Sequence, residues 1–330
     1  MNERIKRYSM QAALLCLLLI ALFSSAALAQ DGKDKVQPTG KPVLWKDPGD
    51  INSRDLLAGP GGEGMKPDVS NLTFVEEDAS GFSYGMRVRD GAGKTWVIKL
   101  GKEAQPETAA SRLLWAAGYM SEIHYLYPCV RVNGAPNPSK DVPRCEGNGF
   151  ANARFEARPE GIKRLDEWSW ANNPFVGTRE LKGLIIMMAL INNWDLKDSN
   201  NKVIYVPASL TGGEDELQYI LSDLGATFGK TGSFLSRNRN NPKDYAKTKF
   251  VTGVQGNTVK FNYGGKNQGL MNGITTEDAR WIGGILEKLS DKQIEDAFRA
   301  GNFSPEEVQL LRQAVRQRIT QLSTLSASAR

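Results

Sequence analysis

The chain has 330 residues, of which 40% are hydrophobic and 24% charged, and its formal net charge is +5. This length allows one large two-lobed domain or two small ones. The modest charge, without a basic helix that carries interleaved aromatic residues, excludes nucleic acid from the expected partners. The single histidine, His124, excludes a histidine-based zinc cluster, and its apolar and aromatic neighbours indicate a structural role.

Residues 1–29 have the composition of a signal peptide. Arg4, Lys6 and Arg7 precede an apolar stretch over residues 12–23, and Ala-Leu-Ala at 27–29 fits a cleavage site. The apolar stretch has about a dozen residues, whereas a membrane-spanning helix needs roughly 20. We therefore expect an exported protein, periplasmic or secreted, whose mature chain begins at Gln30 and keeps no stable membrane span. A retained membrane anchor is the alternative.

The elements of the first half predict a small β-rich lobe over residues 72–158. Before it, the polar and Gly- and Pro-rich residues 30–71 predict an extended or partly disordered lead-in, with Trp45 and Leu56 as points where it docks. The lobe itself contains β-prone runs and one amphipathic helix opened by Pro106. The runs are 72–77, 84–89, 95–100, 125–132 and 151–157, and the helix is 107–117.

Two cysteines, Cys129 and Cys145, flank a proline-containing loop between the last two of these strands. In the oxidising compartment that the signal peptide predicts, they are plausible disulfide partners. Two free thiols are the alternative.

A turn at residues 158–161 predicts a hinge, after which the pattern becomes mainly helical over residues 159–323. Helices are expected at 162–170 and 178–192, and short strands at 202–206 and 217–221. Residues 225–273 predict a long loop and a small hairpin. The final helices have capping boxes at Ser290 with Gln293 and at Ser304 with Glu307, and the tail 324–330 is expected to fray.

The sequence Gly-Ala-Gly-Lys-Thr at 91–95 resembles the end of a phosphate-binding P-loop. That motif requires a glycine at position 88, where this chain has Val88, and a helix after the Lys-Thr pair. Because a strand is predicted there instead, we interpret these residues as a hairpin turn.

Two acidic motifs lie at the ends of secondary structure elements in the second half. Asp195 and Asn200 follow a predicted helix, and Asp223 follows a predicted strand. Phosphoryl transfer requires oxygen ligands for a divalent metal and a carboxylate that orients the acceptor hydroxyl. Asn200 and Asp223 can hold the metal, and Asp195 can serve as the base. An Asx-rich turn at a helix end is the structural alternative for this stretch.

Lysines at two positions supply the charge that a triphosphate would need. Lys99 ends the third strand and can hold the phosphates, Lys197 can reach the transferred phosphate, and Glu107 is expected to orient Lys99 through an ion pair. The structural alternatives are a surface lysine at a strand end and a helix-terminal acid favoured by the helix dipole.

Together these motifs resemble the protein-kinase superfamily. H-R-D-L-x-x-x-N is matched from Asp195 to Asn200, V-A-I-K by residues 96–99, and D-F-G by residues 223–225. The resemblance covers roughly residues 72–322. It implies an α+β, two-lobed protein-kinase-like fold, in which a small antiparallel sheet lobe with one helix and a larger mainly helical lobe hold ATP with Mg²⁺ or Mn²⁺ between them.

Departures from the usual pattern indicate an atypical branch. Asn193 and Trp194 replace the His-Arg pair, no A-P-E follows, and Glu107 lies close behind Lys99. The chain in this respect resembles persistence-toxin, phosphatidylinositol, spore-coat and animal secretory-pathway kinases. Residues 78–85 lie where the glycine-rich loop would be, so that Gly81 and Ser83 are expected to cover the phosphates.

The sequence therefore predicts an exported phosphotransferase that moves the γ-phosphate of ATP to a hydroxyl acceptor, which could be a protein, glycan, lipid or small molecule. The basic loop 230–249 would face an acidic or phosphorylated substrate, or it is simply a solvated loop. The alternative function is a catalytically inactive kinase-like module that binds nucleotide or a partner.

Overall fold

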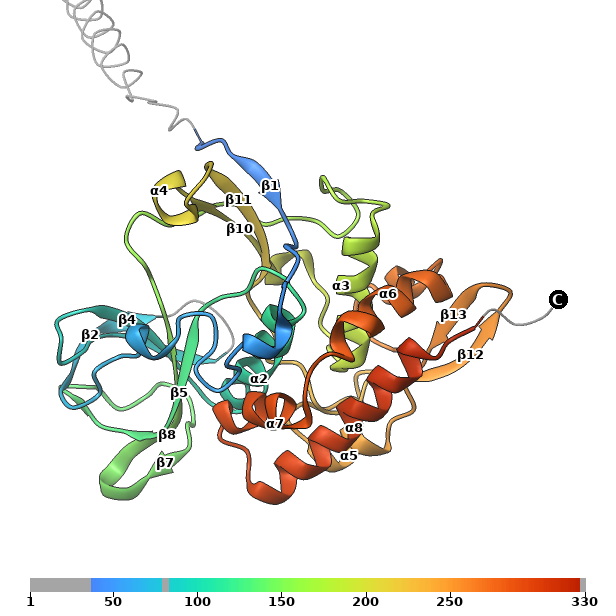
Figure 1. The fold of residues 1–330 in the computed structure, drawn as a ribbon. Helices are drawn as coiled ribbons and strands as arrows, with labels where there is room; N and C mark the ends of the chain where they lie inside the picture. Colours follow the sequence, from blue (N-terminus) through green and yellow to red (C-terminus); the bar gives the residue numbers. More distant parts are fainter. Residues whose placement is uncertain (1–36, 79–82, 327–330) are drawn as a thin grey trace, which may run out of the picture. The chain divides into compact units, whose positions relative to one another are not determined.

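The computed structural model describes residues 37–78 and 83–326, and the fold below is that of the compact unit Thr39–Arg330. This unit has a smaller lobe, built on an antiparallel sheet with one helix, and a larger, mainly helical lobe (Figure 1). The predicted α+β, two-lobed architecture is confirmed. The predicted signal peptide lies outside the described residues. Within the described ranges, no helix combines the length and hydrophobicity needed to cross a bilayer.

The sheet of the smaller lobe has the strand order β5-β8-β4-β3-β2-β6 within the described chain, with β7 paired to β8. Alternation along β3 and β4 places Met86, Val88 and Ile98 in a fully buried core, because successive side chains of a strand point to opposite faces. The elements are β2 (Leu72–Asp78), β3 (Tyr84–Arg89), β4 (Thr95–Leu100), α2 (Ala104–Ala116), β5 (His124–Val130), β6 (Val132–Asn133), β7 (Arg144–Cys145) and β8 (Gly149–Glu156).

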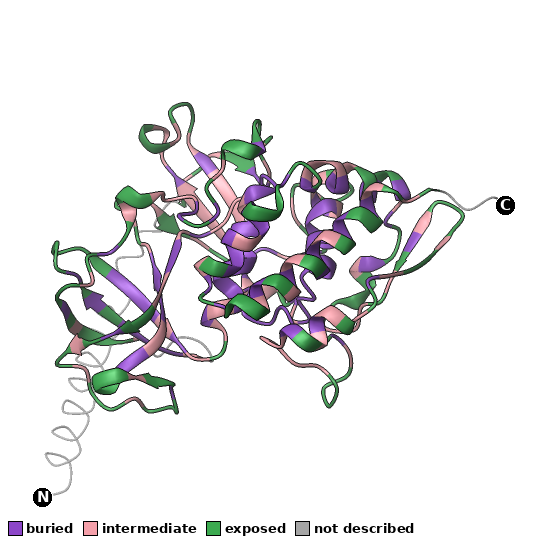
Figure 2. Cartoon of the chain, turned by 60° about the horizontal axis from the view of Figure 1, so that its bottom comes forward, coloured by how far each residue is buried: buried purple, intermediate pink, exposed green. Residues whose placement is uncertain are grey.

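The apolar residues of helix α3 are buried and belong to the core of the larger lobe. Figure 2 shows buried residues along the packed helices of this lobe. Both predicted capping boxes are present, at the starts of α7 and α8. The helices are α3 (Arg179–Leu190), α4 (Ala208–Thr211), α5 (Pro242–Lys247), α6 (Thr276–Leu286), α7 (Asp291–Ala300) and α8 (Pro305–Ser323). The strands are β1 (Lys41–Val43), β9 (Lys163–Arg164), β10 (Asn201–Val206), β11 (Glu216–Leu221), β12 (Val251–Gln255) and β13 (Thr258–Phe261).

The predicted lead-in is, from β1 onward, part of the folded unit, which corrects the expectation of an extended or partly disordered segment. β1 pairs in parallel with β11, and Ile51 and Leu56 are buried in the core of the larger lobe. The Gln293 side-chain amide donates to the carbonyls of Ile51 and Arg54 at 2.8 and 2.9 Å. The pairing of β1 with β11 joins segments more than 160 residues apart in sequence, and local composition does not reveal such a partner.

The prediction of a helix at 162–170 is wrong. β9 pairs with β10, and the ladder continues as Leu165 N–H donates to Val203 and Val203 N–H donates to Asp166, at 2.8 and 3.0 Å. The apolar spacing that resembled a helix places Trp168 and Trp170 in the core instead. Tertiary pairing with β10 therefore overrides the local helical pattern.

The disulfide predicted between Cys129 and Cys145 is present, and its sequence separation is 16. Replacing both cysteines with serine should lower the free energy of unfolding by about 3 kcal/mol, because a cross-link over a loop of this size restricts the unfolded chain. Urea denaturation of the oxidised protein and of the double variant measures the difference. Reductant should destabilise the native protein and leave the double variant unchanged; equal stability of the two proteins would contradict the prediction.

Candidate functional site

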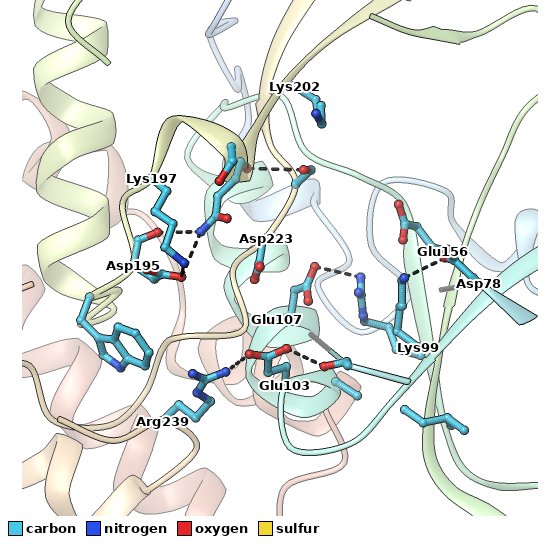
Figure 3. Close-up of a pocket in the computed structure, with 18 of the residues that line it drawn as sticks. Asp78, Lys99, Glu103, Glu107, Glu156, Asp195, Lys197, Lys202, Asp223 and Arg239 are labelled. Atoms are coloured by element: carbon cyan, nitrogen blue, oxygen red, sulfur yellow. Dashed lines mark hydrogen bonds and ion pairs between the residues drawn. The ribbon is translucent and has the colours of Figure 1, made fainter. Parts of the chain in front are cut away.

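A cavity of about 680 Å³ is lined by residues of both lobes (Figure 3). It brings together side chains from β4, α2, the loop after α3 and the end of β11. The predicted site residues that line it are Ser83, Lys99, Glu107, Asp195, Lys197, Asn200 and Asp223. Gly81, the remaining predicted residue, lies outside the described residues.

The end of α3 fixes where the loop with Asp195 begins. Asn192 adopts a left-handed conformation with φ of 55°, the amide of Asn193 donates to Met188 at 2.9 Å, and the amide of Asn192 donates to Ala189 at 3.1 Å. These two bonds form a Schellman motif, in which asparagine is the common substitute for glycine at the left-handed position. The Asn-Asn pair therefore ends the helix and directs the chain towards the cavity.

Arg318 of α8 binds the same end of α3. Its guanidinium donates to Leu190 O at 2.6 Å, to Asn192 Oδ1 at 2.9 Å and to Tyr245 O at 3.1 Å, and it lies 4.0 Å from the ring centre of Tyr245. Arg318 is buried, and burial lowers its pKa from the ordinary value. Its several donors satisfy carbonyls that the end of a helix leaves without partners.

The loop after α3 holds its own polar groups in place. Asp195 accepts from Lys197 Nζ through Oδ2 at 2.8 Å, and its backbone amide donates to Asn193 Oδ1 at 3.0 Å. The Asn200 side-chain amide donates to the Asp195 carbonyl at 2.6 Å. Because the nitrogen of that amide is engaged, its Oδ1 is the atom of Asn200 that remains for a ligand.

Asp223 lies beside this loop because β11 and the loop are bonded to each other. Ser222 N–H donates to the carbonyl of Asn200 at 2.8 Å, and Gly225 N–H donates to Asp223 Oδ1 at 3.1 Å. A Cβ at Gly225 would lie 2.5 Å from Cβ of Glu103, so the glycine allows the close approach of α2. Packing thus requires the glycine of this Asp-Leu-Gly sequence, while the aspartate supplies the carboxylate.

The expected ion pair between Lys99 and Glu107 is replaced by two others in the described residues. Lys99 Nζ pairs with Asp78 Oδ2 at 2.7 Å, and Glu107 Oε1 pairs with Arg154 Nη1 at 2.9 Å. Lys99 and Arg154 are direct partners in the β4–β8 ladder, so both side chains project from the same face of the sheet. The longer guanidinium reaches Glu107, and this corrects the sequence-based pairing.

Arg154 belongs to a largely buried charge network that forms part of the cavity wall. Its Nη1 lies 2.7 Å from His124 Nε2, which in turn lies 3.1 Å from Glu122 Oε2, while Arg164 pairs with Glu122 and with Glu156. Glu122, His124 and Glu156 are close enough to resemble a metal site. Arg154 already contacts His124, and Arg164 pairs with both glutamates, so protein cations balance the negative charge that a metal ion would otherwise balance.

Burial controls the charges in this network. Burial raises the pKa of Glu107 well above its ordinary value, and the charge of Arg154 opposes this shift in part. Burial lowers the pKa of His124 well below its ordinary value, and the charge of Arg154 adds to this shift. Burial and Glu122 raise the pKa of Glu156. Burial also acts to raise that of Glu122, but the hydrogen bond to Glu156 and the charge of Arg164 leave it lowered.

Three site features were missed by the sequence reasoning. Arg154 is the ion-pair partner of Glu107. Glu103 joins the lobes, because it accepts a hydrogen bond from Ser83 Oγ at 2.5 Å and pairs with Arg239. Arg237 lies 4.2 Å from the ring centre of Trp194. Only the alternation along β8 gave a signal, because it placed Arg154 on one face of a strand. The other contacts join segments far apart in sequence.

A search of protein-family models found no match, and a search of curated proteins found none either. Among solved structures, the chain is similar to the crystal structure of a Helicobacter pylori proinflammatory kinase, CtkA. The sequences are 12% identical, the TM-score is 0.44, and the similarity covers 76% of this chain and 96% of that chain. A likeness this slight does not bear on activity, which has to be inferred from the cavity itself.

Arg318→Met should lower the free energy of unfolding by about 3 kcal/mol or more, because buried carbonyls lose their donors. Amide hydrogens of residues 190–197 should also exchange faster, as the helix end is released. Denaturation and hydrogen exchange measure the two effects. Arg280→Met, at an exposed position on α6, is the matched control and should change stability by less than about 1 kcal/mol. Equal effects of the two substitutions would contradict the role of Arg318.

His124 should stay neutral at pH 6, which NMR can follow directly because the chain has a single histidine. In the unfolded chain the imidazole should titrate near pH 6.5. The unfolded state then gains a proton that the folded state does not, so this group lowers stability as pH falls below about 6.5. His124→Gln should remove that contribution. An imidazole that titrates near pH 6.5 in the folded protein would refute the prediction.

Proposed function

We propose that the protein is a kinase-like phosphotransferase that moves the γ-phosphate of ATP to a hydroxyl acceptor. The observation that carries the proposal is the convergence of Asp195, Asn200 and Asp223 with Lys99 in one cavity. These residues come from both lobes, and Lys99 lies at least 96 positions before the other three in the sequence. A carboxylate base, two oxygen donors for metal and a lysine for phosphate are the parts that phosphoryl transfer requires.

The donor atoms suit a hard divalent cation such as Mg²⁺ or Mn²⁺. Asn200 has its amide nitrogen engaged and its oxygen available, and Asp223 accepts one backbone hydrogen bond through Oδ1, which leaves carboxylate capacity for a metal. When bound, the metal would neutralise charge on the triphosphate. Asn200 and Asp223 are the residues that would hold it.

The remaining roles follow from charge and position. Asp195 can accept the proton of an acceptor hydroxyl, and Lys197, held 2.8 Å from it, places a positive charge beside the transferred phosphate. Lys99 would bind phosphate from the smaller lobe, and Asp78 would orient it in place of Glu107. Glu103, bonded to Ser83 and paired with Arg239, holds the two lobes together over this chemistry.

We also propose that the protein acts outside the cytoplasm, as an atypical relative of the protein kinases. The signal-peptide composition of residues 1–29 and the Cys129–Cys145 disulfide support export, because such bonds persist in oxidising compartments. The acceptor would be a protein, glycan, lipid or small molecule.

One observation favours the alternative of a module that binds without transfer. Lys99 and Lys197 are both paired with carboxylates, Asp78 and Asp195, so the site neutralises part of its own charge. A ligand would have to displace these pairs before either lysine could contact phosphate.

ATP with Mg²⁺ or Mn²⁺ should stabilise the purified protein against heat, by about 2.7 kcal/mol at a ligand concentration one hundred times Kd. Asp223→Asn and Lys99→Met should remove most of this metal-dependent shift, since each deletes a proposed ligand contact. Differential scanning fluorimetry measures it. Asp141→Asn, at an exposed position in the disulfide loop, is the control and should respond like the native protein.

Asp195→Asn should keep nucleotide binding and lose phosphate transfer by at least about 100-fold, as expected on removal of a general base. Transfer from radiolabelled ATP to candidate acceptors is the measurement. Binding that persists without any transfer in the native protein would favour the non-catalytic alternative. A folded protein that no nucleotide or metal stabilises would refute both.

A further inference from the structure

One end of the cavity is lined by charged side chains where the smaller lobe joins the larger. We call Glu156, Arg158, Arg164 and Lys202 the hinge cluster. Glu156 ends β8, Arg158 lies in the connection between the lobes, Arg164 belongs to β9, and Lys202 belongs to β10. In Figure 3, Glu156 and Lys202 lie on the side of the cavity away from Asp195 and Lys197.

The cations of the hinge cluster are partly exposed, whereas the carboxylates that pair with its two arginines are buried. Arg158 pairs with Glu156 at 2.5 Å, and their side chains are 35% and 6% exposed. Arg164 is 31% exposed and pairs with Glu122, which is 4% exposed. Lys202 is 27% exposed and pairs at 3.0 Å with Glu167, which is 47% exposed. Because Glu167 does not line the cavity, a ligand at this end lies against Arg158, Arg164 and Lys202 with Glu156 buried behind them.

The buried carboxylates do not cancel that charge in full. Glu156 pairs with both Arg158 and Arg164, and Glu122 pairs with Arg164. Glu107 is already paired with Arg154. Nine Lys and Arg side chains line the whole cavity, against six Asp and Glu side chains in its lining and two more, Glu122 and Glu167, that pair with its cations from outside, which leaves an excess of one positive charge.

The same end lacks the walls that a purine base needs. Bases bind between apolar or aromatic surfaces, and the apolar residues that line this cavity within the described chain are Leu100, Ala104 and Trp194. None belongs to the hinge cluster. Trp194 adjoins Asp195 at the opposite end, where Arg237 and Arg239 lie over its ring at 4.2 and 4.8 Å.

We propose that the hinge cluster is an anion subsite, and that the cavity selects a phosphate-rich ligand by its phosphate groups and not by a nucleobase. The ligand class is a polyphosphate long enough to reach from Lys99 and Asp223 to Arg158 and Lys202. This proposal rests on the proposed function in that it names the ligand class of the same cavity. It assigns a role in ligand binding to charged side chains that phosphoryl transfer does not use.

The test compares four probes by calorimetry at fixed ionic strength and fixed Mg²⁺: ATP, adenosine, inositol hexakisphosphate and a linear inorganic polyphosphate of about ten phosphates. Variants Lys202→Gln and Arg158→Gln remove one accessible cation each. Lys163→Gln is the matched control, because Lys163 precedes Arg164 in β9 and lies over Tyr205 instead of in the cavity. Circular dichroism and melting temperature show whether each variant is folded.

The linear polyphosphate should bind more tightly than ATP, and adenosine should not bind. Each hinge variant should weaken polyphosphate binding by about tenfold, which is the size of one charge-assisted contact. Lys163→Gln should bind like the native protein. Tighter binding of inositol hexakisphosphate than of the chain, with the same sensitivity to Lys202, would still support the subsite and identify a compact ligand. Equal losses in the hinge and control variants would overturn it as non-specific attraction.

The two proposals fail in different ways. Tight binding of adenosine, or of ATP without any effect of Lys202→Gln and Arg158→Gln, would overturn the anion subsite and leave phosphotransfer standing. Polyphosphate binding that depends on Lys202, in a protein with no transfer that requires Asp195, would keep the subsite and refute the enzyme. A folded protein that binds none of the four probes refutes both.

Discussion

The buried guanidinium of Arg318 fixes the geometry on which the cavity depends. It binds the C-terminal carbonyls of α3, the side chain of Asn192 and the backbone beside Tyr245, so that three segments of the larger lobe meet at one charge. The left-handed turn at Asn192 then directs the chain towards Asp195. A buried arginine is stable only when its donors are satisfied, and here they are satisfied by carbonyls that a helix end leaves open. The loop with Asp195 and Asn200 therefore starts from a rigid point.

The smaller lobe is organised by a second set of buried charges. Arg154 lies opposite Lys99 in the sheet and takes the carboxylate of Glu107, and Lys99 pairs with Asp78 at the end of β2. The ion pair with Arg154, which the strand directs towards α2, offsets part of the cost of burying Glu107. One result is that Lys99 is oriented by Asp78 at the end of β2, and not by helix α2.

The cavity combines oxygen donors at one end with cations at both. Asn200 and Asp223 suit a divalent metal, Lys99 and Lys197 lie near them, and the hinge cluster adds three accessible positive side chains. An arrangement of this kind favours a ligand that carries several negative charges along its length. The proposed activity and the proposed anion subsite are two consequences of the same electrostatics, one at the metal end and one at the hinge end.

The sequence by itself determined the strands of the smaller lobe, the two capping boxes, the disulfide and the motif residues that now line the cavity, because each depends on residues close together in the chain or on a pattern of fixed spacing. Tertiary structure alone decided which carboxylate Lys99 meets, that residues 162–170 form no helix, and that β1 joins β11. It also decided the position of Arg318. Ion pairs and strand pairing depend on side-chain reach and on neighbours from distant segments, and local pattern carries no record of either.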